Sequence, residues 1–230
     1  MTLFLSRLTL DKRAGNAAIA PLLDPEDSGQ ALNAHHRLLW AAFGDHEDRE
    51  RDFLWRDEGR GRFMVLSQRP PAPHPLFRPP ETKEFAPALA PGDRLAFVLR
   101  ANATRDRAAL SRSPKEERRG KSRRVDVVMD GLHRLPEGAS RADHRMRVAE
   151  EAGRDWLGAQ GARAGFTPET VEVEDYRAIP LRRGRGRLGL LDLRGILTVD
   201  DPARFVERLA QGFGRARAFG CGLMLIRRAG

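Results

Sequence analysis

Two adjacent residues with complementary chemistry, His36 and Arg37, stand in an apolar stretch near the N-terminus. Histidine has a reference pKa of about 6.5, so it is the side chain most easily used as a general acid or base near neutrality. An arginine beside it can hold a phosphate and stabilise charge that develops in a transition state. A histidine on a helix is also a common packing residue, so the pair alone fits either role.

A second candidate is the glycine- and arginine-rich stretch QGFGRARAFGCGL at residues 211–223. Its glycines lack a Cβ, so the backbone can approach an anion and point N–H groups at phosphate oxygens. The stretch follows a predicted helix, precedes a predicted strand and lacks a Gly-Lys-Ser/Thr ending. It is therefore neither a dinucleotide-binding turn nor a P-loop. The alternative interpretation is a tight turn in which the glycines only permit the bend.

A metal site is the other chemistry that these residue types allow. The available ligands are His35, His36, His46 and Cys221. Their spacing matches no zinc pattern and there is no second cysteine, so we expect no bound metal and no cofactor. The single cysteine also excludes an internal disulfide, which is typical of a protein from a reducing cytoplasm.

The composition favours a polyanionic partner. The chain has 230 residues, enough for one large or two small domains, and its 41 Lys and Arg exceed its 32 Asp and Glu to give a net charge of +9. Nearly all the basic residues are arginine, which we attribute to a GC-rich genome. No apolar run approaches the roughly 20 residues of a membrane span, and the N-terminus lacks a signal-peptide layout. We therefore expect a soluble cytoplasmic protein that does not contact a membrane.

The first half of the chain must position His36. Residues 28–43 predict its clearest helix, with Leu32, His36, Leu39 and Phe43 on one face. The strands around it are predicted at residues 2–10, 53–56, 63–68 and 93–101, with a proline-rich irregular segment at 69–80. This order is close to the βαββαβ ferredoxin-like plan that RNA-binding domains also use.

The second half must position the glycine-rich stretch. Residues 105–124 are highly charged and poor in apolar side chains, which indicates a basic loop at a domain boundary. Beyond it we predict strands at 125–129, 171–177, 188–199 and 221–227, and helices at 141–160 and 201–211. The prediction is an α+β protein with two tandem ferredoxin-like (RRM-like) domains, at residues 1–104 and 125–230.

Six segments occur together in the order and spacing of the CasE family, the CRISPR RNA maturation endoribonucleases of type I-E systems. They are LFLSRLTL, AHHRLLWAAF, RDFLWR, LRANAT, KSRRVDVV and GFGRARAFGCGL, and the match covers residues 2 to about 227. This resemblance implies tandem ferredoxin-like folds and metal-independent cleavage of precursor CRISPR RNA at the base of the repeat hairpin. It also implies that the guide RNA stays bound with other type I-E Cascade subunits, and the free protein is expected to be a monomer.

The resemblance also implies roles for residues of the first helix. His36 matches the family's catalytic histidine in the spacing His-x-x-Leu-Trp, with His35 as the alternative register, and Arg37 would bind the scissile phosphate. Well-known relatives have a tyrosine where this chain has Asn33, which can form hydrogen bonds but cannot titrate or stack in the same way. We expect an altered rate and the same reaction. In it the ribose 2′-OH attacks the adjacent phosphorus, leaving a 2′,3′-cyclic phosphate and a 5′-OH, with His36 as base or acid.

RNA contacts are expected from two groups of residues. The basic segment is similar to a family hairpin laid into the groove of the RNA stem, although Glu116 and Glu117 also fit a solvated linker. The RNA-binding candidates are Arg118, Arg119, Lys121, Arg123, Arg124, Gly212, Gly214, Arg215, Arg217, Gly220 and Gly222. A non-catalytic CRISPR RNA-binding subunit, which would not need His36, stays open as an alternative. A DNA-binding regulator is disfavoured because no helix-turn-helix pattern is present.

Overall fold

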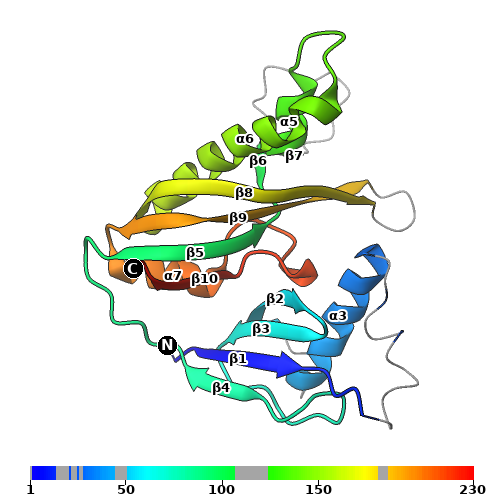
Figure 1. Cartoon of the computed structure of the whole chain (residues 1–230). Coiled ribbons are helices and arrows are strands. Elements are labelled where there is room, and N and C mark those ends of the chain that lie inside the picture. Colours follow the sequence, from blue (N-terminus) through cyan, green and yellow to red (C-terminus); the bar gives the residue numbers. More distant parts are fainter. Residues whose placement is uncertain are drawn as a thin grey trace, which may run out of the picture.

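The computed structural model describes residues 2–13, 21, 25, 28–44, 51–106, 124–180 and 186–230. It contains two antiparallel four-stranded sheets, and the second lies above the first in Figure 1. Helix α3 lies beside the first sheet, and α6 and α7 lie beside the second (Figure 1). Within the described ranges, no helix is long and apolar enough to cross a membrane.

The first sheet forms a ferredoxin-like unit. Its strands have the order β2-β3-β1-β4, and every neighbouring pair is antiparallel. The connection from β3 to β4, where the plan has its second helix, is irregular and rich in proline, a poor helix former. The elements are β1 (Phe4–Thr9), α3 (Ser28–Phe43), β2 (Phe53–Gly59), β3 (Arg62–Ser67) and β4 (Glu81–Glu84).

The second sheet repeats the plan with the strand order β10-β5-β9-β8, again antiparallel throughout. The prediction of two tandem ferredoxin-like domains is therefore confirmed. A two-stranded ribbon, β6 and β7, and the short helix α5 are inserted between β5 and α6. The elements are β5 (Arg94–Ala101), β6 (Thr104–Asp106), β7 (Arg124–Asp126), α5 (Val127–His133), α6 (Arg141–Ala164), β8 (Phe166–Pro180), β9 (Arg187–Val199), α7 (Pro202–Gln211), the 3-10 turn η3 (Arg217–Phe219) and β10 (Met224–Arg228).

The strand expected at residues 93–101 belongs to the second sheet and not to the first half of the chain. It is β5, and it pairs with β9 and β10. Its alternating Leu95, Phe97 and Leu99 are buried in the second core. The edge of the first sheet is instead taken by β4, whose residues are all exposed and give no apolar signal. The second sheet thus begins at Arg94, before the predicted border at residue 104.

Residues 125–129 were expected to form a strand, but only Val125 and Asp126 do, as the end of β7, and helix α5 begins at Val127. The chain leaves β7 at Asp126, whose carboxylate accepts hydrogen bonds from the backbone N–H groups of Val128 and Met129 at 3.0 and 2.9 Å. This cap starts helix α5 at Val127. A local carboxylate cap outweighs the strand preference of the valines here.

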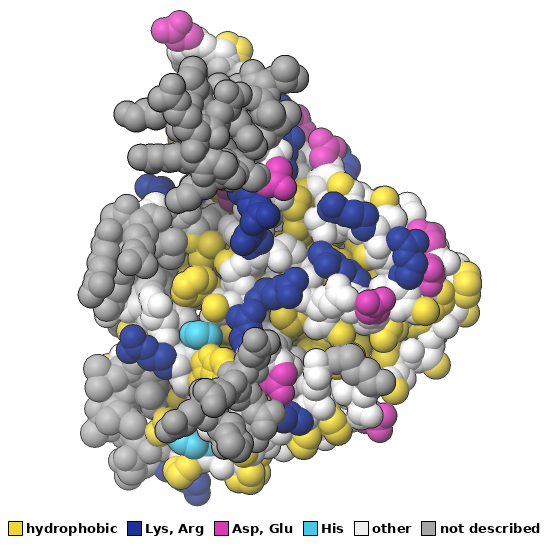
Figure 2. All heavy atoms as spheres, turned by 180° about the vertical axis from the view of Figure 1, so that it is seen from behind, with side chains coloured by type: hydrophobic (Ala, Val, Ile, Leu, Met, Phe, Trp, Pro, Cys, Tyr) yellow, Lys and Arg dark blue, Asp and Glu magenta, His cyan; other side chains and the backbone are white. Residues whose placement is uncertain are grey.

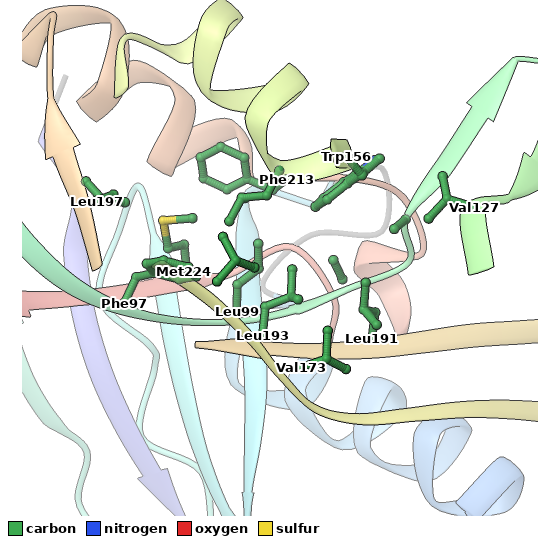
Figure 3. Close-up of a cluster of buried hydrophobic side chains, with 14 of the residues drawn as sticks. Phe97, Leu99, Val127, Trp156, Val173, Leu191, Leu193, Leu197, Phe213 and Met224 are labelled. Carbon is green, nitrogen blue, oxygen red and sulfur yellow. The ribbon is translucent and has the colours of Figure 1, made fainter. Parts of the chain in front are cut away.

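The core of the second domain also fixes the glycine-rich loop. Leu99 and Leu193 of adjacent strands meet Trp156 of α6 in a buried cluster (Figure 3). Phe213, from the loop itself, is fully buried in the same cluster. Burying a side chain of this size contributes about 1.5–3 kcal/mol. The loop is therefore anchored to the second domain by its own phenylalanine.

Candidate active site

Helix α3 presents its two histidines to different surroundings. His35 is only 2% exposed and packs edge-on against Phe63 and Trp55, with ring centroids 4.9 and 6.3 Å away. His36 is half-buried at the edge of the same helix. The sequence predicted His36 on the apolar face of this helix. In the structure His35 is the buried histidine and His36 is only half-buried. His36 is therefore the histidine that a substrate can reach.

The hydrogen bonding of His36 fixes its protonation state. The indole N–H of Trp40, one turn further along α3, donates to Nε2 of His36 at 3.0 Å. An accepting Nε2 carries no proton, so the ring is neutral with its proton on Nδ1. Burial, and then the positive charges of Arg51 and Arg37, lower the pKa of His36 below its ordinary value. Near neutral pH, His36 is therefore available to accept a proton.

Arg51→Met is expected to raise the pKa of His36, because it removes a nearby positive charge and keeps most of the side-chain bulk. Titration of the imidazole by NMR in both proteins checks the sign. Arg154→Met, which removes an exposed charge on α6, is the matched control and should leave the pKa of His36 unchanged. An unchanged or lower pKa in Arg51→Met would show that the charge of Arg51 does not lower the pKa of His36.

Asn33 is held by the helix on which it lies. Its side-chain amide nitrogen donates to the backbone carbonyl of Gly29 at 2.8 Å, one turn earlier in α3. The residue is partly buried, whereas Arg37 is exposed on the same helix. The amide nitrogen of Asn33 is thus already engaged within α3, and a role of Asn33 beside His36 stays a prediction.

The glycine-rich loop lies against β2 of the first domain. Gly212 has φ +77°, and a Cβ there would lie 2.8 Å from the side chain of Leu54. Gly220 has φ +72°, and a Cβ there would lie 3.0 Å from the ring of Trp55. Gly214 and Gly222 are similarly confined by the backbone of Asn102 and Phe213. These four glycines let the loop approach protein atoms closely, and side chains at Gly212 and Gly220 would push the loop off β2.

Several backbone N–H groups of this loop bind protein carbonyls. Phe213 donates to Gly222, Arg215 to Asn102, and Gly222 to Arg100, at 2.9, 3.3 and 2.8 Å. These N–H groups are used to hold the loop's shape. The prediction that the loop contacts phosphate therefore depends more on its arginine side chains, of which Arg215 is exposed and Arg217 half-buried.

The loop brings Arg217 to the side of the molecule that carries His36. Leu32 of α3 packs with Phe219 and Cys221 in a cluster shared between the two domains. Figure 1 shows the turn η3, which contains Arg217, beside α3. Burial, and then the positive charge of Arg217, lower the pKa of Arg51, the same arginine whose charge acts on His36. Sequence reasoning missed Arg51, because it follows a charged run that reads as a solvated loop.

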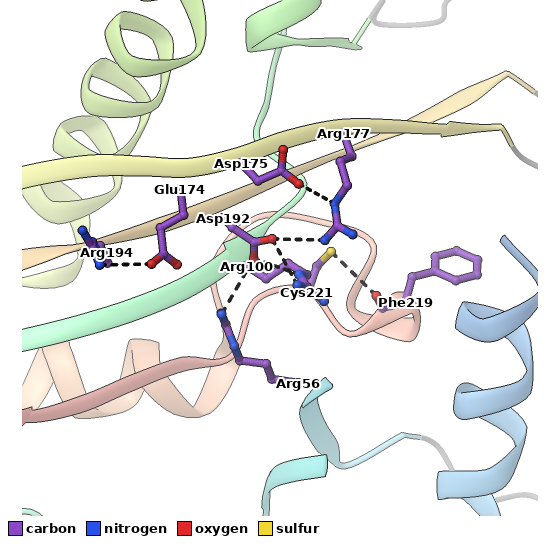
Figure 4. A network of polar contacts seen from close by, with 9 residues as sticks. All are labelled: Arg56, Arg100, Glu174, Asp175, Arg177, Asp192, Arg194, Phe219 and Cys221. Atoms are coloured by element: carbon purple, nitrogen blue, oxygen red, sulfur yellow. Dashed lines mark hydrogen bonds and ion pairs between the residues drawn. The ribbon is translucent and has the colours of Figure 1, made fainter. Parts of the chain in front are cut away.

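A buried carboxylate ties the two domains together behind the loop (Figure 4). Asp192 of β9 is 6% exposed and accepts two hydrogen bonds from Arg100, at 2.8 and 3.1 Å. Arg177 of β8 donates to it at 3.2 Å. Arg56, from β2 of the first domain, lies 3.8 Å away, and burial lowers its pKa. One aspartate thus holds three arginines across the domain interface.

The predicted RNA-binding hairpin is described only at its base. β6 and β7 form an antiparallel pair in register from Thr104 with Asp126 to Asp106 with Arg124. The Nε of Arg124 donates to Asp106 at 2.9 Å. The other basic candidates of this segment lie outside the described residues, namely Arg118, Arg119, Lys121 and Arg123. Their contact with RNA stays a prediction.

The metal ligands considered from the sequence are not brought together. No group of three His, Cys, Asp or Glu side chains suited to a metal occurs in the parts of the chain that the structure describes, and His46 lies outside them. Burial raises the pKa of the Cys221 thiol to about 12. Cys221 is therefore a protonated core residue near neutral pH.

Basic side chains gather on one face of the protein. Figure 2 shows the face opposite to the one seen in Figure 1, where a histidine side chain reaches the surface between Lys and Arg side chains. Further Lys and Arg side chains follow across the second domain on this face, with some Asp and Glu side chains among them (Figure 2). A surface of this kind attracts the phosphate backbone of a nucleic acid.

The known proteins that this chain resembles are CRISPR-associated proteins. Residues 3–228 match the family model described as CRISPR associated protein. The CRISPR system Cascade subunit CasE of Escherichia coli strain K12 is 26% identical over 202 residues, which cover 82% of this chain and 88% of that protein.

Solved structures agree with this over the full length. Thermus thermophilus Cse3 bound to an RNA representing a pre-cleavage complex has a TM-score of 0.66 at 26% identity, covering 99% of this chain and 100% of that chain. The CRISPR-associated protein Cas6e from Escherichia coli K-12 has a TM-score of 0.57 at 22% identity and covers 98% of this chain and 100% of its own; it shows the fold alone.

Proposed function

The chain belongs to the CRISPR-associated protein family, as a CasE-type member, and we propose on this premise that it is a CRISPR RNA-processing endoribonuclease and a subunit of a type I-E Cascade complex. The observation that carries the proposal is His36, neutral and half-buried on α3 under the charges of Arg37 and Arg51, with Arg217 of the glycine-rich loop acting on Arg51 in turn. The relative from Thermus thermophilus, aligned along nearly the whole chain, binds an RNA that represents a pre-cleavage complex.

The reaction is attack of a ribose 2′-oxygen on the adjacent phosphorus. The new O2′–P bond forms while the P–O5′ bond breaks, which leaves a 2′,3′-cyclic phosphate and a 5′-OH. One proton leaves the 2′-OH and one is added to the departing 5′-oxygen. The nucleophile belongs to the RNA, so the mechanism needs neither a protein nucleophile nor a metal ion.

His36 serves best as the general base of this step. Its lowered pKa keeps the ring neutral, and a neutral imidazole accepts a proton far more readily than it gives one up. Nε2 is the accepting atom, so Trp40 must release its hydrogen bond to His36 when the 2′-OH arrives. The role of general acid at the 5′-oxygen would first require protonation of the ring. Arg37 neutralises the charge of the scissile phosphate, and the loop arginines Arg215 and Arg217 neutralise RNA phosphates at or beside it.

Recognition of the repeat hairpin is assigned to the basic residues of the second domain. The ribbon β6–β7 projects from this domain and would enter the groove of the RNA stem with its basic segment. Phosphate contacts dominate this binding because few aromatic side chains are exposed. These contacts persist after cleavage, so the mature guide stays bound.

One observation favours a second candidate function. Asn33 occupies the position of the tyrosine expected from the resemblance, and its amide nitrogen is engaged with the backbone of α3. A protein that binds CRISPR RNA without cutting it would retain the basic surface and could lose this tyrosine. Cleavage activity separates the two candidates.

The test is incubation of the wild-type protein with the RNA hairpin encoded by the CRISPR repeats of its own genome, in excess EDTA. We expect a single cut at the base of the stem, a 2′,3′-cyclic phosphate on the 5′ product and retention of that product. The matched substrate with one 2′-deoxynucleotide at the cut should bind and stay intact. Tight binding without any cleavage would contradict the nuclease and support the non-catalytic RNA-binding subunit.

A further inference from the structure

Two arginines from different domains lie close enough for their charges to interact. Arg51 precedes β2 in the first domain, and Arg217 lies on η3 in the second. Arg217 donates one hydrogen bond, at 3.4 Å, to the backbone carbonyl of Gly212. Among the described residues, neither arginine forms an ion pair with a carboxylate. Their positive charges therefore repel each other, and burial, followed by this repulsion, lowers the pKa of Arg51.

Both arginines line the same cavity at the domain interface. Its volume is about 340 Å³, enough for a phosphate group, and Ser67, Gln68 and Gln211 contribute further polar groups to its wall. Two acidic residues, Asp52 and Glu207, also line it, and each accepts a hydrogen bond from a neighbouring side chain. Asp52 accepts from Arg69 at 2.8 Å, and Glu207 accepts from the side chain of Gln211 at 3.0 Å.

The arrangement is unfavourable without an anion and favourable with one. Two half-buried guanidinium groups held close together lose solvation and repel each other. A phosphate between them would relieve both costs, because guanidinium groups donate paired hydrogen bonds to its oxygens. Phe53, which lines the cavity, packs 5.5 Å from the ring of Trp40, and Trp40 donates to His36, so the anion would lie on the side of the cavity that leads to the histidine.

We propose that Arg51 and Arg217 form a phosphate-binding subsite that holds a backbone phosphate of the bound RNA beside the scissile one. The subsite is complete only when the two domains are in contact, so a phosphate bound there bridges the domains. This inference rests on the proposed function, because it takes RNA as the ligand, and it adds Arg51 as a residue that contacts the substrate.

The experiment is a phosphate scan of binding. The repeat hairpin is made with a 2′-deoxynucleotide at the cut site to prevent cleavage, and a neutral methylphosphonate replaces one phosphate at a time near that site. Affinity is measured for wild type, Arg51→Met and Arg217→Met, with Arg154→Met on α6 as the matched control. For unmodified RNA we expect each test variant to bind about tenfold more weakly than wild type and the slope of log Kd against log salt to fall by about one.

The decisive result concerns a single position. At one phosphate, methylphosphonate should weaken wild type and Arg154→Met by about tenfold while leaving Arg51→Met and Arg217→Met nearly unaffected. Equal penalties in all four proteins at every position would overturn the subsite. Because the scan reads binding only, wild type that binds without cutting refutes the nuclease and leaves the scan interpretable. Wild type that binds no hairpin overturns both proposals.

Discussion

His36→Ala is expected to bind the repeat hairpin as tightly as wild type and to cut it about 10²- to 10⁴-fold more slowly. The loss is large because the 2′-OH would have no positioned base, while the residual rate comes from the arginines that neutralise the phosphate. Binding is retained because the basic surface is unchanged. The measurement is the single-turnover cleavage rate in EDTA at saturating protein, with the affinity for the 2′-deoxy hairpin determined in parallel.

Two further histidine variants sharpen this result. His144→Ala changes a partly buried histidine on α6 and should leave the cleavage rate unchanged. His35→Ala leaves a cavity beside Trp55 and Phe63, so it should lower the melting temperature while the folded fraction still cuts. A folded His35→Ala protein that is inactive, next to an active His36→Ala protein, would contradict the assignment and move the base to His35.

Helices with a clear apolar period were predictable from the sequence. The expected helix at residues 28–43 coincides with α3, and the long helix expected at 141–160 lies within α6. Elements without that signal were missed or misassigned. β4 has four polar, exposed residues, and the start of α5 depends on the carboxylate cap of Asp126. Assigning β5 to a sheet required knowledge of its pairing partners, which the local sequence does not contain.

A candidate site residue could be named from the sequence where it lies in a recognisable motif, but not where its position depends on the contact between the two domains. His36 was named from the resemblance, and the structure shows that it is more exposed than His35; its catalytic role stays a prediction. Arg51 gives no signal by itself, because its importance comes from Arg217, far along the chain and on the other domain. The glycine-rich loop was predicted to approach an anion, but its Cβ positions point at Leu54 and Trp55. The glycines correctly indicated a close approach of the backbone, but the sequence alone could not show that the approaching atoms belong to the protein.

The contact between the domains also makes a strong prediction for Asp192. Asp192→Ala should lower the free energy of unfolding by about 3 kcal/mol, because it leaves Arg56, Arg100 and Arg177 without their shared carboxylate. We take the lower end of the range for a broken buried pair, since Arg177 is 42% exposed and water screens part of its charge. Urea denaturation of wild type and variant, with equal slopes, measures the difference.

Asp175→Ala is the matched control for Asp192→Ala, because it removes the other carboxylate that pairs with Arg177 at a position 46% exposed. Its loss of stability should stay below about 1 kcal/mol. Equal losses in the two variants would mean that water replaces Asp192 at no cost and that the arginine cluster does not hold the domains together. A larger loss in Asp192→Ala, with slower cleavage as well, would link this carboxylate to the site. Arg56 lies on β2, and the backbone carbonyl of Arg100 on β5 accepts a hydrogen bond from Gly222 of the loop. Both strands that support the loop therefore depend on Asp192.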